Sequence, residues 1–200
     1  DSSTEAKILE AAKTVFMKYG LYGARMQDIA DTAGINKALL HYYFRSKEKL
    51  FEQIFKEVSV QFFPRIMEIF DQDISLFEKI RRLAEEYIDQ LKATPYLPVF
   101  IINEINRQPE AFIEKMWKGR KPPIYKFVAQ VKEEIEAGNI RPVDPLQLFL
   151  HMLSLCVFPF LARPIFETVG GISRQQFEQL LEQRKKEIPE FIIHSIRKDK

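Results

Sequence analysis

The sequence predicts an all-α fold, and three features support this class. The 200 residues include only 7 glycines, against 17 phenylalanines. The charged residues make up 29% of the chain and are mainly Lys, Glu and Arg, which are good helix formers. No stretch has the alternation of apolar and polar residues that is typical of a strand. We therefore expect helices around a core rich in aromatic side chains.

Start and stop signals predict three short helices in the first quarter of the chain. The first begins at a capping box of Ser2 and Glu5 and keeps an apolar pattern at helical spacing until Gly20. The second ends at Gly34, because glycine readily adopts the left-handed conformation. Asn36 can cap the third. The second and third helices are expected over residues 27–33 and 37–44.

Six further helices are expected in the rest of the chain. Prolines mark their irregular points: Pro64 kinks or ends the fourth helix, Pro122 and Pro123 interrupt the seventh, and Pro189 bends the ninth. The expected ranges are 46–64, 76–93, 95–107, 109–138, 145–163 and 174–197. The all-α chain therefore has about nine helices.

Charge and composition narrow the possible partners. The formal net charge is only +2, so a nucleic-acid surface would have to be a local basic patch. The single cysteine, Cys156, excludes an internal disulfide framework and fits a reducing cytoplasm. The most apolar stretch, 146–162, is short for a bilayer span and contains Gln147, His151 and Pro159. We expect this stretch to be a helix covered by protein, with no membrane partner.

Residues 26–44 have the proportions of a helix-turn-helix, in which a second short helix enters the major groove of DNA. A purely structural pair of helices is the alternative. At 100° per residue, one arc of the second helix carries Lys37, Ala38, His41, Tyr42 and Arg45. Leu40 and Phe44 would pack inward. The small Ala38 lets the backbone approach base edges, and the polar side chains offer donors to bases or phosphates.

Positive charge is concentrated around the same helix. Residues 36–49 contain four Lys or Arg and one Glu, a net +3 that exceeds the charge of the whole chain. A charge run is often only a solvated face. Lys47, however, falls in the first turn of the next helix, where unpaired N–H groups and the helix dipole favour a phosphate.

This segment resembles the signature of the TetR family of transcriptional regulators. The matching runs are Asp28-Ile29-Ala30, Ala33-Gly34-Ile35-Asn36, Leu40-His41-Tyr42-Tyr43-Phe44 and Ser46-Lys47-Glu48-Lys49-Leu50. The resemblance implies DNA contacts from Gln27, Lys37, Ala38, Leu39, His41, Tyr42 and Lys47. Two positions depart from the family pattern. His41 stands where a tyrosine is usual, and Met26 replaces a threonine that would cap the helix and bind phosphate.

The resemblance also implies an effector pocket and a dimer. Residues 95–130 carry aromatic side chains with isolated polar groups, which suit a small hydrophobic effector or simply form core. The pocket candidates are Phe100, Asn103, Glu104, Met116, Trp117 and Phe127. The last two helices would form a four-helix bundle with a second copy, with a central buried helix in a monomer as the alternative. The interface candidates are Leu148, His151, Leu155 and Phe158.

Catalysis finds little support in the sequence. The three histidines are far apart and lack ligand-spaced partners, and no glycine-rich phosphate loop is present. We expect no enzyme activity, metal or cofactor. The prediction is a DNA-binding domain over 1–46 and an effector-binding and dimerisation domain over 47–200. The predicted function is a homodimeric repressor, released from a palindromic double-stranded operator by a small hydrophobic effector. A helical ligand-binding or scaffold protein without operator binding is the alternative.

Overall fold

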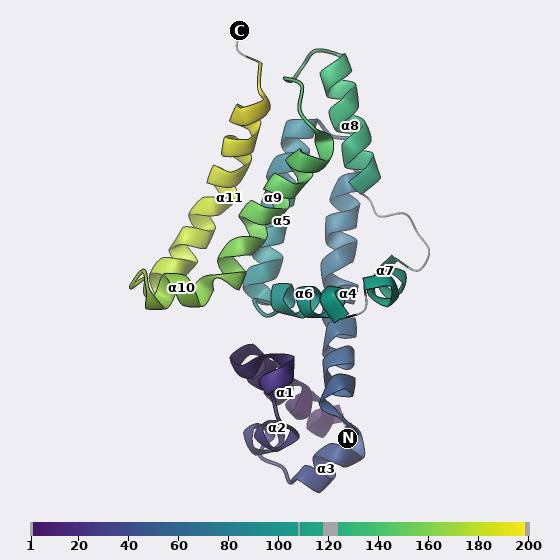
Figure 1. Ribbon diagram of the computed structural model, residues 1–200, viewed down its shortest axis with the longest axis vertical. Helices are drawn as coiled ribbons and strands as arrows, with labels where there is room; N and C mark the ends of the chain where they lie inside the picture. The colour runs from purple at the N-terminus through teal and green to yellow at the C-terminus, as the bar shows by residue number, and fades with distance from the viewer. Residues whose placement is uncertain (1, 108, 118–123, 199–200) are drawn as a thin grey trace.

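The computed structural model describes residues 2–107, 109–117 and 124–198 and confirms the all-α class (Figure 1). The described residues form eleven helices: α1 (Ser2–Gly23), α2 (Met26–Ala33), α3 (Lys37–Tyr43), α4 (Lys47–Asp71), α5 (Leu76–Ala93), α6 (Leu97–Arg107), α7 (Pro109–Trp117), α8 (Ile124–Glu136), α9 (Pro145–Leu161), α10 (Arg163–Thr168) and α11 (Arg174–Ile196). An isolated antiparallel bridge joins Ile140 to Arg197.

The helices form a small lower group and a larger upper body (Figure 1). Helices α1, α2 and α3 pack together at one end of the molecule. The long α4 begins beside them and runs upward into the body, where α5 packs against α4, α9 and α11. Helix α6 crosses between the two groups. This arrangement places α3 at the end of the molecule opposite the C-terminus.

Helix α4 continues through Pro64, where the sequence suggested a kink or an end. Proline removes the hydrogen bond to the carbonyl four residues earlier, which belongs to Val60. Val60 lies on an exposed side of the helix, so water can reach that carbonyl. Phe62 and Ile66 are buried on either side of the proline and hold the helix against the body. The packing of these two side chains therefore outweighs the cost of the hydrogen bond that Pro64 removes.

The two helices beyond the expected nine have separate origins. The segment expected as one interrupted helix over 109–138 consists of α7 and α8, and Pro122 and Pro123 lie outside the described residues. The short α10 follows directly after α9, with Pro164 in its first turn. Helix α6 begins at Leu97 rather than at Pro95.

Helix α5 is the centre of the upper body because one of its faces is buried along its whole length. The side chains on this face are Leu76, Lys79, Ile80, Leu83, Ala84, Ile88 and Leu91. Lys79 donates a hydrogen bond to the carbonyl of Phe70, 3.1 Å away at the end of α4. A lysine is favourable there because helix C-termini carry unpaired carbonyls and partial negative charge. Burial lowers the pKa of the Lys79 ammonium.

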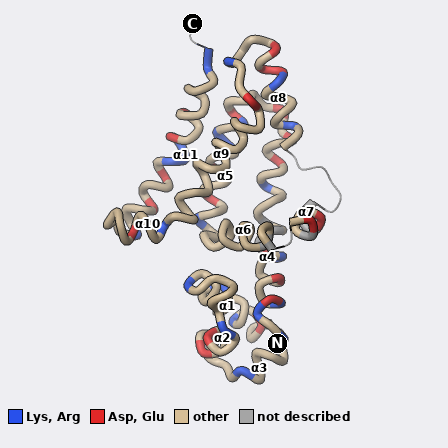
Figure 2. The backbone as a smooth tube through the Cα atoms, viewed as in Figure 1, with Lys and Arg blue, Asp and Glu red and all other residues tan. Residues whose placement is uncertain are grey.

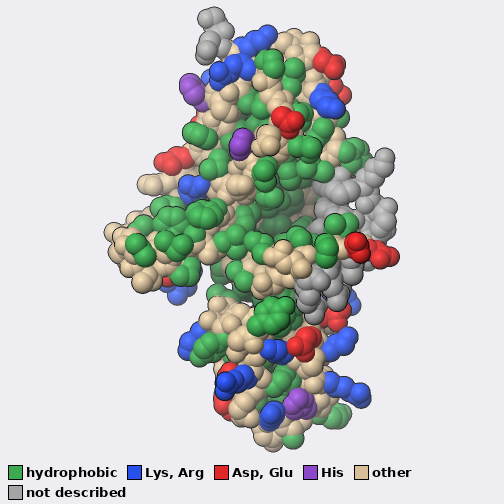
Figure 3. Space-filling model, in the orientation of Figure 1, with side chains coloured by type: hydrophobic (Ala, Val, Ile, Leu, Met, Phe, Trp, Pro, Cys, Tyr) green, Lys and Arg blue, Asp and Glu red, His purple; other side chains and the backbone are tan. Residues whose placement is uncertain are grey.

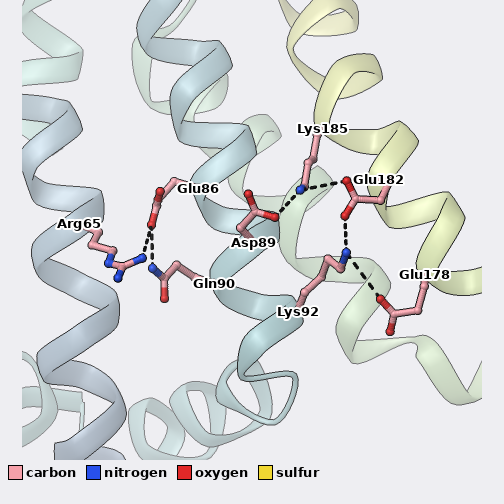
Figure 4. A network of polar contacts seen from close by, with 8 residues as sticks. All are labelled: Arg65, Glu86, Asp89, Gln90, Lys92, Glu178, Glu182 and Lys185. Atoms are coloured by element: carbon pink, nitrogen blue, oxygen red, sulfur yellow. Dashed lines mark hydrogen bonds and ion pairs between the residues drawn. The ribbon is translucent and has the colours of Figure 1, made fainter.

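A chain of ion pairs connects the exposed edges of α5 and α11 (Figure 4). Lys92 of α5 pairs with Glu182 and, at 3.8 Å, with Glu178. Lys185 of α11 pairs with Asp89 and, at 3.0 Å, with Glu182. Hydrogen bonds from Lys92 and then Lys185 lower the pKa of Glu182. Exposed pairs each contribute little to stability, so this network serves mainly to align the two helices.

Within the described part of the chain, no helix has the length and apolar character needed to cross a membrane. Helix α9 was the candidate raised by the sequence, and it is only 17 residues long. Its side chains Met152, Cys156 and Phe160 are buried against the rest of the body. Asp144 caps its N-terminus and Pro145 occupies its first turn, as helix start signals predict.

Candidate nucleic-acid interface

A short, well-defined turn holds α2 and α3 in a helix-turn-helix. Gly34 ends α2 in the left-handed conformation with φ of 69°, and its N–H bonds back to the end of the helix. A non-glycine residue would be strained at this backbone angle. Asn36 then starts α3, because its side-chain oxygen accepts a hydrogen bond of 2.8 Å from the N–H of Leu39. Ile29 and Leu40 are fully buried in the hydrophobic core, and α2 packs against both α1 and α3.

The outward face of α3 carries the predicted DNA-contacting side chains. Lys37, Ala38, His41 and Tyr42 are exposed, and Tyr42 keeps 81% of its surface accessible. Leu39 is 37% exposed, so it also reaches the surface. The opposite side of the helix is buried through Leu40 and Phe44, as expected. Figure 2 shows basic residues around α3 and the start of α4.

Lys47 has partners that the sequence did not reveal. Its ammonium donates to the carbonyls of Tyr22, in the last turn of α1, and of Ala24, just after it, at 3.0 and 3.1 Å. An ammonium has three donors, so one remains for a phosphate. Lys47 therefore ties α4 to α1 as well as placing positive charge at the N-terminus of α4.

Two other predicted contacts are partly engaged within the protein. The Nδ1 atom of His41 lies 3.2 Å from the carbonyl oxygen of Arg45. Because a carbonyl only accepts, the proton sits on Nδ1, and Nε2 is the nitrogen directed elsewhere. Gln27 is exposed and donates a 2.8 Å hydrogen bond to the carboxylate of Asp31. The Gln27 amide has a second N–H, which remains to donate to DNA.

The structure also presents cations that the sequence prediction left out of the site. Arg25 is exposed directly before α2 and makes no side-chain cap. Arg45 is exposed between α3 and α4, beside a groove of about 790 Å³ that also includes Lys49. The sequence offered one sign of both residues, since each is a basic residue next to a predicted helix start. Met26, by contrast, is partly buried against the core, so it packs as a hydrophobic side chain.

Of the predicted effector residues whose side chains the structure describes, Phe100 and Phe127 make ring contacts in different parts of the molecule. Phe100 is buried and stacks on Phe51, with ring centroids 3.9 Å apart, at the junction of α4 and α6. Phe127 is fully buried in the upper body and lies 6.1 Å from the ring of Phe70. Asn103 is half-buried. The side chains of Glu104, Met116 and Trp117 lie outside the described residues.

The predicted dimer residues differ in how much surface they offer. Phe158 is 58% exposed and His151 is exposed, while Leu155 is half-buried. Leu148 is only 2% exposed, which leaves almost nothing for a partner to cover. A groove of about 660 Å³ runs between α9 and α11, and exposed Phe191 lies on its edge. The apolar side chains around α9 and α10 are prominent in Figure 3.

A capped helix-turn-helix on an all-helical body defines the class of DNA-binding transcription regulators. Two family models match the chain: "Bacterial regulatory proteins, tetR family" over residues 8–54 and "Tetracyclin repressor-like, C-terminal domain" over residues 77–192. The chain belongs to the tetR family of bacterial regulatory proteins. It is therefore a DNA-binding transcriptional regulator of a non-enzymatic family whose members act as dimers.

Curated relatives and solved structures agree with this family. The regulator RutR of Escherichia coli strain K12 is 23% identical over 98% of this chain and 92% of its own length. The repressor KstR2 of Mycolicibacterium smegmatis is 29% identical over 75% of each chain. The solved structure of KstR2 from Mycobacterium tuberculosis has a TM-score of 0.73 and 20% identity, covering 97% of this chain and 95% of its own. At that identity the structural likeness shows the fold alone.

Proposed function

We propose that this protein is a homodimeric repressor that reads a palindromic operator with α3. The proposed DNA-binding domain covers residues 1–46, and residues 47–200 bind the effector and the second copy. The observation that carries the proposal is the exposed face of α3, where Lys37 and Tyr42 point away from a helix anchored by Leu40. Such a face fits a major groove, whose base edges present hydrogen-bond donors and acceptors.

The residues that would read the base sequence differ from those that would position the protein on the DNA backbone. Lys37 and Ala38 are at the first turn of α3, the part of a recognition helix that meets base edges. Lys47, Arg25 and Arg45 surround this helix and offer charge to phosphates, which fixes the position without reading sequence. The local charge matters because the whole chain carries only +2.

Dimerisation is proposed through α9 and α11. Phe158 and Phe191 are large apolar side chains left exposed on these helices, and the groove between them offers an apolar surface to a second copy. Two copies related by a twofold axis would present two α3 helices to DNA. Recognition helices about 34 Å apart meet successive major grooves on one side of the duplex.

An effector would act by favouring a different spacing of the α3 helices. The stack of Phe51 on Phe100, with Phe16 of α1 5.9 Å from Phe100, joins the lower helices to α6. A ligand in the upper body that shifts α6 would thus move α1 and α4. It can lower operator affinity only by the difference in its affinity for the two states.

Binding to the DNA upstream of the protein's own gene tests the proposal. Fluorescence anisotropy of that DNA should show saturable binding that weakens steeply with salt. An unrelated DNA of equal length is the control and should bind at least 1,000-fold more weakly. Equal binding to both DNAs would reject operator recognition. A regulator that binds chromosomal DNA would work in the cytoplasm of a bacterium.

A further inference from the structure

Tyr87 occupies an unusual place on α5. It lies in the middle of the buried face of the helix, one turn from Leu83 on one side and from Leu91 on the other. The neighbouring side chains on this face, including Ala84 and Ile88, are between 0 and 1% exposed. Tyr87 is only half-buried. Since the whole face points into the body, the uncovered part of Tyr87 borders a space inside the protein.

The surroundings of Tyr87 support an enclosed space rather than bulk water. Its ring packs edge-to-face on Phe62 of α4, with centroids 5.5 Å apart, and buried Cys156 of α9 is near enough to raise the pKa of its phenol further. Burial raises the pKa of the Tyr87 phenol, which an open aqueous surface would not do. Figure 3 shows a hollow lined by hydrophobic side chains in the upper body, above α6 and beside α9. The space bounded by α4, α5 and α9 is therefore apolar.

Tyr87 contributes a hydroxyl, a polar group, to this space. No hydrogen bond joins this hydroxyl to a residue that the structure describes, and the ring packs on that of Phe62. A phenol of raised pKa stays protonated, so it is a neutral donor. Buried tyrosine hydroxyls usually have a partner. A ligand acceptor would supply the missing one.

We propose that Tyr87 is the polar anchor of the effector cavity and that the effector is an uncharged, mainly apolar molecule with one hydrogen-bond acceptor, such as an ester or ketone. This inference rests on the effector role in the proposed function. A charged ligand is disfavoured because transfer of an ion into an apolar site is costly without a counter-ion. Two cations lie near this space, and each is engaged by a backbone carbonyl. Lys79, two turns away on α5, donates to Phe70, and Arg184 of α11, whose charge acts on Cys156, donates to Leu155.

Dye binding to the full-length protein tests the cavity. Nile red is uncharged and apolar, carries a carbonyl acceptor, and brightens in apolar surroundings. Tyr87→Phe should weaken Nile red binding about threefold to tenfold, the effect of one lost hydrogen bond, without lowering the melting temperature. Tyr87→Trp should fill the space and abolish binding while the protein remains folded by circular dichroism. Val169→Ser removes an exposed apolar side chain at the end of α10 and should leave the affinity unchanged, as the control for surface binding.

Competition with methyl decanoate and decanoate tests the ligand class. These molecules share one chain, and the ester should displace Nile red at a concentration at least tenfold lower than the carboxylate. Tighter binding of decanoate would overturn the uncharged ligand. Absence of Nile red binding, equal affinity in Tyr87→Phe, or unchanged binding in Tyr87→Trp would overturn the cavity. A Tyr87→Trp protein that unfolds would show that no space exists there.

Fluorescence anisotropy of operator DNA distinguishes a failure of this inference from a failure of the proposed function. If the ester occupies the cavity and releases operator DNA, both the Tyr87 cavity and the effector role are supported. If it displaces Nile red through Tyr87 while operator affinity stays constant, the cavity inference stands and the effector role fails. If operator binding is normal but neither Nile red nor the ester binds, DNA recognition stands and the inference about Tyr87 fails.

Discussion

Arg184 of α11 donates a hydrogen bond of 2.7 Å from Nη2 to the carbonyl oxygen of Leu155 in the middle of α9. In an unbroken helix this carbonyl would accept from the N–H four residues later. That residue is Pro159, which has no N–H. The guanidinium therefore replaces the missing donor from a neighbouring helix. A proline in α9 and an arginine in α11 thus act as one structural unit.

A double-mutant cycle measures the energetic coupling between Pro159 and Arg184. Arg184→Met should lower the free energy of unfolding by about 1–3 kcal/mol, because the carbonyl of Leu155 is left without a donor. In a Pro159→Ala background the alanine N–H can bond to Leu155, so the same substitution should cost clearly less. Urea unfolding of the four proteins gives the coupling. Equal costs of Arg184→Met in both backgrounds would show that Pro159 and Arg184 are independent.

Lys47→Ala should affect stability and DNA binding together. Loss of the donor to Tyr22 and Ala24 should lower the melting temperature, since the carbonyl of buried Ala24 loses a partner. Operator and unrelated DNA should both bind more weakly, with a salt slope shallower by about one unit. Lys186→Ala removes an exposed charge on α11 and should change none of these. Loss of operator binding alone would instead assign Lys47 to base reading.

Lys37→Ala should relax base preference. Lys37 is exposed at the first position of α3, and a guanine contact from there is worth about 1–3 kcal/mol. Its affinity for the operator should fall while its affinity for unrelated DNA changes little. Competition of single-base operator variants in the anisotropy assay checks this. If both Lys37→Ala and Lys47→Ala keep full operator affinity, α3 is not the recognition helix.

His41 should make operator binding depend on pH. Its Nδ1 proton is directed at the carbonyl of Arg45, so Nε2 must gain a proton before it can donate to a phosphate. Binding would then take up a proton, and operator affinity should rise as pH falls from about 8 to about 6. Anisotropy titrations across this range measure the trend. His41→Gln should remove it, and a trend of the same size in that variant would leave His41 without a role.

Phe158→Asp should produce a folded monomer. Phe158 is 58% exposed in the single chain, so an aspartate there disturbs its own core little but would be buried without a counter-ion between two copies. Light scattering at micromolar concentration should report the monomer, and operator binding should be lost. Ile113→Asp, at a similarly exposed position of α7, should remain dimeric. A dimeric Phe158→Asp protein would exclude this face of α9.

Local signals predicted the beginnings and ends of several helices, although α1 continues to Gly23 through a kink at Gly20, where the sequence predicted its end. Gly34 ends α2 and Asn36 caps α3, and Ser173 with Gln176 forms the full capping box of α11. Each of these interactions joins residues only a few positions apart, so the sequence contains both partners. At Pro64 the sequence left a kink or an end of the helix open, and only the structure shows that the helix continues. Whether a helix survives a proline depends on the packing around it, as Phe62 and Ile66 show.

The sequence by itself determined the helical class, the helix-turn-helix and the outward face of α3, because helical periodicity and capping are properties of neighbouring residues. Only the tertiary structure decided that Lys47 bonds to the end of α1, that Phe100 stacks on Phe51, and that Tyr87 packs on Phe62. These relationships join residues 25 or 49 positions apart in the chain. The free energy that selects them comes from close packing of the whole body, which no local pattern encodes.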